Sequence, residues 1–156
     1  MIDDTQMMVM ELAGQGYSCA QIVMLGGLRL MGRENPDLVR AMAGLANGAS
    51  CGEICGALTG GLCLIGVHTA KGLDEERPVL GARMVTNALI KWFRQEKLKG
   101  QVAPDCAAIF EAKGCEYDGE MNSAVGCGEL VADTWTKVIQ LLQENNLDPA
   151  QGRDES

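Results

Sequence analysis

The chain has 156 residues, of which 47% are hydrophobic and only 4% aromatic, and it carries a net charge of −8. This length is sufficient to bury a core without disulfide bonds, so we expect one domain. The charge argues against nucleic acid as a partner, because phosphate backbones are bound by clusters of Lys and Arg.

Apolar periodicity and helix-start signals predict an all-α fold. We expect a single-domain bundle of about six to seven helices that pack closely through glycine. One cysteine-rich domain would cover residues 1–147, with a flexible tail at 148–156. The predicted helices cover residues 3–13, 20–31, 36–45, 50–66, 78–97, 107–112 and 129–145.

The second predicted helix has a clear start signal. Ser18 and Gln21 form a capping box, which places Cys19 at the first helical position. Two glycines within this otherwise apolar helix, Gly26 and Gly27, would let another segment approach closely. The pattern therefore predicts a central helix with a cysteine at its start.

The chain is organised around residues 50–67, where Ser50 and Glu53 predict another capping box. Cys51 would then occupy the first helical position, and Cys55 would lie one turn later on the same side of the helix. Unpaired N–H groups and the positive end of the helix dipole favour a thiolate over a thiol at such a terminus. A reactive or metal-bound sulfur is therefore expected here.

Gly52, Gly56 and Gly60 recur every fourth residue along the same predicted helix. Each glycine in a helix interior costs about 1 kcal/mol relative to alanine, so the strip needs a compensating contact. We expect that this contact is tight packing against another helix. Packing of two copies of the chain through the strip, as a homodimer, is an alternative. The apolar run at 54–67 is too short to span a bilayer, which needs about 20 residues.

The two longest later helices are predicted from their apolar faces. For residues 78–97 the predicted face consists of Leu80, Met84, Ala88, Leu89 and Trp92. For residues 129–145 it consists of Val131, Trp135, Val138, Ile139 and Leu142.

Seven cysteines are an odd number, and the start of the chain lacks the pattern of a signal peptide. We therefore expect a cytoplasmic protein. Structural disulfides are disfavoured in that compartment, which favours metal binding or redox chemistry as the role of the cysteines. Cys19, Cys51, Cys106 and Cys127 each stand at or just before a predicted helix start, and Cys55 stands one turn in. Their spacings match no familiar zinc finger or ferredoxin, so the tertiary fold must assemble the site.

This cysteine series resembles the C-GCAxxG-C-C family of proteins suspected of redox activity. The resemblance rests on Cys19 within Tyr-Ser-Cys-Ala-Gln, on Cys-Gly-Ala-x-x-Gly at 55–60, and on Cys106 and Cys127. It implies a small helical protein with four defining cysteines, namely Cys19, Cys55, Cys106 and Cys127. Cys51 is an addition that could join or replace a ligand.

Three functions are compatible with these residues. The leading hypothesis is electron transfer through an iron–sulfur cluster, because sets of soft thiolates select such clusters or zinc. Zinc is the alternative cofactor and would give a structural or helical interaction module. A metal-free thiol–disulfide protein, with Cys51 or Cys55 as the attacking thiol, is the other alternative.

Several roles stay open at this level. The redox partner protein is not identified, and neither is any catalysed reaction. Cys63 is expected to be an apolar filler, and Cys115 is assigned to a loop without a defined role. His68, the only histidine, is expected to lie at a solvated helix end.

Overall fold

The computed structural model describes residues 1–117 and 127–153. Within these residues the chain forms one all-α domain of seven α-helices without a β-sheet, which confirms the predicted fold class. No helix in the described ranges is long and apolar enough to cross a membrane. The helices are α1 (Asp4–Gly14), α2 (Cys19–Leu30), α3 (Pro36–Met42), α4 (Gly56–Thr69), α5 (Ala82–Trp92), α6 (Cys106–Ala112) and α8 (Gly128–Glu144).

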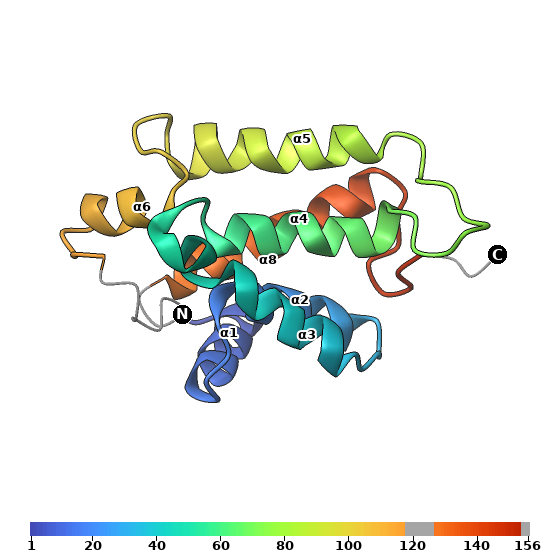
Figure 1. Cartoon of the computed structure of the whole chain (residues 1–156), viewed down its shortest axis with the longest axis horizontal. Helices are drawn as coiled ribbons and strands as arrows, with labels where there is room; N and C mark the ends of the chain where they lie inside the picture. The colour runs from blue at the N-terminus through green and yellow to red at the C-terminus, as the bar shows by residue number, and fades with distance from the viewer. Residues whose placement is uncertain (118–126, 154–156) are drawn as a thin grey trace.

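The central helix is α4, which packs against α2, α5 and α8 (Figure 1). Two adjacent glycines make this close packing feasible. A Cβ added to Gly60 would lie 3.0 Å from the Cα of Ala20 on α2, and one added to Gly61 would lie 3.0 Å from a methyl group of Leu89 on α5. The predicted close packing of helices through glycine is therefore confirmed for Gly60, whereas Gly52 precedes α4 and is not part of the predicted strip on this helix.

The predicted start of α2 is confirmed. Cys19 is its first residue, and the backbone N–H of the N-cap Ser18 donates to Gln21 Oε1 at 3.0 Å. The start of α3 follows the same logic, because the Asn35 side chain accepts a hydrogen bond from the Leu38 N–H at 3.1 Å. Local start signals therefore positioned both helices correctly.

The predicted helix at 50–66 is wrong at its start, because α4 begins only at Gly56. Ser50 and its two preceding residues, Gly48 and Ala49, have left-handed backbone angles, with φ of +59°, +61° and +56°. A right-handed helix cannot include them. The capping box of Ser50 is therefore absent, and Cys51 lies outside the helix.

The predicted apolar face of α5 is partly wrong. Leu80 and Met84 are exposed, whereas Val85, Leu89 and the following Phe93 are buried. The reason is that the helix starts at Ala82, so Leu80 precedes it, and the buried residues then repeat every fourth position.

His68 is buried rather than solvated, so the expectation of an exposed helix end is wrong. Its Nδ1 lies 3.0 Å from the Leu64 carbonyl oxygen, and its Nε2 lies 3.3 Å from the Pro149 carbonyl oxygen. Nearby, the Arg153 guanidinium donates to the Ala70 carbonyl at 2.7 Å. Residues 148–153 are thus bound to the C-terminal end of α4, opposite the end where α6 lies (Figure 1).

Replacing this histidine tests the attachment of the C-terminal segment. His68→Ala is expected to lower the free energy of unfolding by about 2 kcal/mol, because a buried carbonyl group loses its donor and a cavity opens. Urea unfolding measures the change, and Lys71→Ala, at an exposed position three residues away, serves as the control. Equal stability of both variants would contradict the attachment.

Candidate cysteine site

Four buried cysteines stand at the starts of four helices. Cys19 is the first residue of α2 and Cys106 the first of α6, whereas Cys55 and Cys127 are the N-cap residues of α4 and α8. Helices α4 and α8 both begin at the end of the molecule where α6 lies (Figure 1). Cys19, Cys106 and Cys127 therefore have the local positions that the sequence predicted, whereas Cys55 precedes its helix and does not lie one turn inside it.

These four thiols also influence one another electrostatically. They are only 4–7% exposed. The charge of Cys19 raises the pKa of Cys55, Cys106 and Cys127, and the charge of Cys127 raises the pKa of Cys55 and Cys106. The fold has thus gathered side chains from four separate helices into one group, called the cysteine quartet below.

Burial favours the protonated thiol at three members of the quartet. Burial is the main cause that raises the pKa of Cys55 to about 12 and that of Cys106 to about 11. It also raises the pKa of Cys127. Backbone hydrogen bonds from Ala57 and Leu58 at the start of α4 lower the pKa of Cys55 but do not outweigh burial. A bound metal would shift this balance, because coordination deprotonates a thiol.

A small β-bridge holds two of these cysteines in register. Ile54 pairs with Asp105 in an isolated antiparallel bridge. The Cys55 N–H donates to the Pro104 carbonyl at 2.9 Å, and the Cys106 N–H donates to the Glu53 carbonyl at 2.6 Å. The bridge therefore fixes the starts of α4 and α6 relative to each other.

Gly56 makes room for the third member of the quartet. A Cβ at this position would lie 2.5 Å from the Cys19 sulfur and 3.0 Å from the Leu45 carbonyl oxygen. Only a residue without a side chain allows Cys19 to approach the start of α4 so closely. The glycine next to Cys55 therefore has a structural role in the site.

The segment before the bridge holds an unusual backbone conformation. Residues 47–50 form a left-handed turn, which costs about 1–2 kcal/mol for each residue other than glycine. Tyr117 stabilises this turn by donating to the Asn47 carbonyl oxygen at 2.7 Å, and the turn's own Gly48 carbonyl accepts from the Glu53 N–H at 3.1 Å. Such strain is typical of functional sites and is found here directly beside the quartet.

The three other cysteines have different surroundings. Cys51 is exposed, and its thiol donates to the Gly48 carbonyl at 3.4 Å, so it does not share a helix edge with Cys55 as predicted. Cys63 is half-buried within α4, and burial raises its pKa. Cys115 is exposed, and its charge adds to the effect of burial, which is the main cause that raises the pKa of Cys127.

The sequence did not point to two residues beside the quartet. Lys113 lowers the pKa of Cys127 by its positive charge, and Tyr117 covers the turn at residues 47–50. Both lie in a segment that the sequence predicts to be a loop, and the local pattern indicates no contact for either residue. No helix or capping signal could have found them, because their contacts are distant in sequence.

The four thiols are suitable metal ligands, but their arrangement limits which metal ion or cluster they could hold. No three or more Cys, His, Asp or Glu side chains in the described ranges are arranged to hold a single metal ion. A zinc site needs four ligands at about 2.0–2.3 Å, so its thiols must converge on one point. A cluster places iron and sulfide between its ligands and accepts thiols that are more widely spaced.

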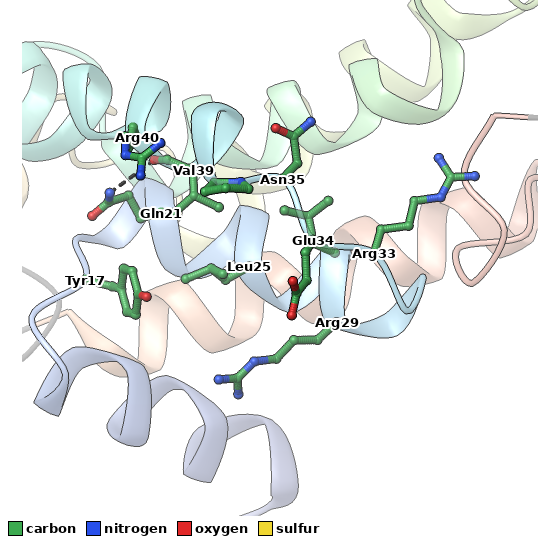
Figure 2. Close-up of a pocket in the computed structure, with 11 residues that line it drawn as sticks. Tyr17, Gln21, Leu25, Arg29, Arg33, Glu34, Asn35, Val39 and Arg40 are labelled. Carbon is green, nitrogen blue, oxygen red and sulfur yellow. Dashed lines mark hydrogen bonds between the residues drawn. The ribbon is translucent and has the colours of Figure 1, made fainter.

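A groove of about 480 Å³ lies apart from these sulfur atoms, between α2 and α3 (Figure 2). Arginines line it, but Arg29 lies 3.5 Å from Glu11, and Arg40 lies 2.7 Å from Asp37. Arg33, which also lines the groove, donates to the Gln151 carbonyl at 2.9 Å. Because all three cations already have partners and no cysteine lines the groove, we place the candidate site at the quartet.

Comparison with known families gives one match. A family model described as "Putative redox-active protein (C_GCAxxG_C_C)" matches residues 17–141. The chain belongs to this family. No curated protein and no solved structure gives a significant match. The match of the C_GCAxxG_C_C family covers all four cysteines of the quartet.

Membership in the C_GCAxxG_C_C family and the geometry concern the same residues. The four cysteines that the family resemblance implied are the four that the fold buries together, whereas Cys51 and Cys115 are exposed. The short glycine motif of the C_GCAxxG_C_C family also has a physical basis here. Gly56 admits the Cys19 sulfur, and Gly60 admits α2.

Proposed function

We propose that this protein transfers electrons through an iron–sulfur cluster held by the cysteine quartet. The observation that carries the proposal is the burial of four thiols at the starts of four helices, with the Cys19 sulfur packed against Gly56 at the start of α4. Soft thiolate ligands in a buried site are the donor set that iron–sulfur clusters use. When bound, such a cluster supplies one-electron transfer at a potential set by burial and by hydrogen bonds to its sulfur ligands.

The residues of this chain would prepare the ligands in defined ways. The amide groups of Ala57 and Leu58 stabilise negative charge on Cys55. The bridge between Ile54 and Asp105 holds Cys55 and Cys106 in position, so the ligands need little reorganisation. Burial excludes water from the site, which protects a reduced group from side reactions.

Anaerobic purification tests the proposal directly. We expect iron with a matching amount of acid-labile sulfide and a broad visible absorption band. Each single Cys→Ser variant of the quartet is expected to lose most of its iron, because a hydroxyl is a poor ligand for iron in this setting. Cys63→Ser is the matched control, since Cys63 lies in α4 but outside the quartet, and it should keep its iron.

The acid–base properties of the quartet add a second readout. Iron loading must release protons from Cys55 and Cys106, whose pKa values burial raises to about 12 and about 11. Loading should therefore become more favourable as pH rises from 7 to about 9. Protein that takes up no iron after anaerobic reconstitution, while circular dichroism shows it folded, would contradict the proposal. Zinc alone would favour a structural role.

A metal-free dithiol function is the second candidate. It is favoured by Lys113, whose positive charge lowers the pKa of Cys127 against the effect of burial. A thiolate is the attacking species in disulfide exchange, and Lys113 offsets part of the effect of burial, which still raises the pKa of Cys127. Counting thiols before and after reduction of iron-free protein separates this function from a cluster.

A further inference from the structure

Basic residues are concentrated in one segment of the chain, residues 77–99, which includes α5. This segment holds six of the thirteen lysines and arginines but only one of the twenty-one acidic residues. Each lysine or arginine outside the segment interacts with a neighbouring group, as Lys137 does with Gln140 at 3.4 Å. Within the described residues, five cations of the segment are exposed and have no side-chain hydrogen bond or ion pair, namely Arg77, Arg83, Lys91, Arg94 and Lys99. Their charge is therefore available to another molecule.

Three of these cations lie on the outer face of α5, called the basic face below. Arg83, Lys91 and Arg94 are separated by eight and three residues, which is close to whole turns of a helix. Arg94 lies in the π-helical turn Phe93–Lys97 that directly continues α5. The opposite face of α5 is buried in the core through Val85 and Leu89. The basic face is thus directed away from the core, and α5 forms one edge of the molecule in Figure 1.

The C-terminal end of the basic face lies near the quartet. Lys97, at the end of the π-helical turn, has its Nζ 3.7 Å from Glu129 Oε1. Glu129 is in the first turn of α8, two residues after Cys127. In Figure 1 the C-terminal end of α5 is at the same end of the molecule as α6. A molecule that binds Lys91 and Arg94 would therefore lie at the end of the protein that holds the quartet.

The chemistry of this surface favours a protein partner over a membrane. A helix that lies on a membrane inserts an exposed apolar face, but the apolar face of α5 is used within the domain. Among the large apolar side chains of α5, which is described in full, only Met84 is fully exposed, at 72%. The chain outside residues 77–99 is strongly acidic, so an anionic membrane would repel it. A protein surface that carries carboxylates complements the basic face without such costs.

We propose that the basic face of α5 is the docking surface for an acidic redox protein that exchanges one electron with the quartet's cluster. This inference rests on the proposed function and names the kind of partner. In each encounter one protein is oxidised by one electron and the other is reduced by one. Unpaired surface cations suit this role, because electron-transfer complexes bury little area and depend on charge to steer and orient the partner.

Binding tests the docking surface without reference to iron. The full-length, iron-free protein, labelled with ¹⁵N, is titrated with oxidised flavodoxin, a small acidic electron carrier. We expect the largest changes of amide chemical shift in residues 82–99. The dissociation constant should increase at least about tenfold when salt rises from about 20 mM to about 200 mM, because salt screens exposed charges. No binding at low salt, or shifts confined to other helices, would refute the docking surface.

Two double variants separate local docking from the effect of net charge. Lys91→Gln with Arg94→Gln should weaken flavodoxin binding at least about tenfold, because two unpaired cations of the basic face are lost. Arg29→Gln with Arg40→Gln is the matched control, since it removes the same charge from the groove between α2 and α3. Equal weakening by both pairs would overturn the proposal. Binding to phosphatidylserine vesicles through Lys91 and Arg94, without binding to flavodoxin, would assign the face to a membrane instead.

Iron content and electron transfer distinguish the failure of either proposal. If the protein loads a cluster but Lys91→Gln with Arg94→Gln binds flavodoxin normally, the docking surface is refuted and the cluster stands. If flavodoxin binds at α5 but the protein never loads iron, the cluster fails and the binding surface stands. If both hold, reduced flavodoxin should reduce the loaded protein. The same double variant should then slow this step at least about tenfold at low salt, with its visible spectrum unchanged.

Discussion

Gly48→Ala is expected to lower the free energy of unfolding by about 4 kcal/mol, since overpacking and a left-handed alanine act together. A Cβ at this position would lie 2.4 Å from the Glu53 carbonyl oxygen and 2.5 Å from the Glu53 nitrogen. Both are backbone atoms, so no side-chain rotation relieves the clash. Because the Glu53 carbonyl also accepts from the Cys106 N–H, the displacement should reach the quartet.

The neighbouring residue gives a control of opposite sign. Ala49 has the left-handed φ of +56° without being glycine, so Ala49→Gly should raise the free energy of unfolding by about 0.5–1 kcal/mol. Urea unfolding of both variants measures the difference. Similar effects of the two substitutions would mean that residues 47–50 do not form the left-handed turn.

Gly56→Ala is expected to lower the free energy of unfolding by about 3 kcal/mol through overpacking. The new methyl group would meet the Cys19 sulfur at 2.5 Å and the Leu45 carbonyl oxygen at 3.0 Å. Rotation of Cys19 relieves the first contact but moves its thiol away from the quartet, and the second contact requires a backbone shift. Alkylation of Cys19 should therefore become faster in the folded variant.

Gly66→Ala in the same helix is the matched control. No atom lies within 4 Å of a Cβ added there. The substitution should stabilise the protein by up to about 1 kcal/mol, because alanine favours a helix over glycine. Chemical unfolding and thiol alkylation are measured side by side on both variants. If Gly56→Ala were as well tolerated as Gly66→Ala, the close approach of Cys19 to α4 would be refuted.

The sequence was most informative where a helix start depends on neighbouring residues alone. Ser18 with Gln21 and Asn35 with Pro36 were sufficient to place α2 and α3, because their capping contacts span three residues. The same reasoning failed at Ser50, although the pattern looked equally good. There, contacts distant in sequence stabilise a left-handed turn, among them the hydrogen bond from Tyr117 to Asn47.

Which apolar residues of a helix are buried was harder to predict than where the helix begins. For α5 the composition suggested Leu80 and Met84 as core residues, yet both are exposed. A difference of a few residues in the helix start decides which of several apolar positions meets the core. His68 was misjudged for a related reason, because the segment that buries it, around Pro149, is far away in the sequence.

By itself, the sequence determined the all-α class and the positions of Cys19, Cys106 and Cys127 at helix starts, because these follow from composition and local capping. The position of Cys55 at the start of α4 was not predicted. Only the tertiary structure decided that Cys51 stays exposed while the quartet is buried together. The physical reason is that helix starts are set by bonds within one turn, whereas a site shared by four helices depends on their packing.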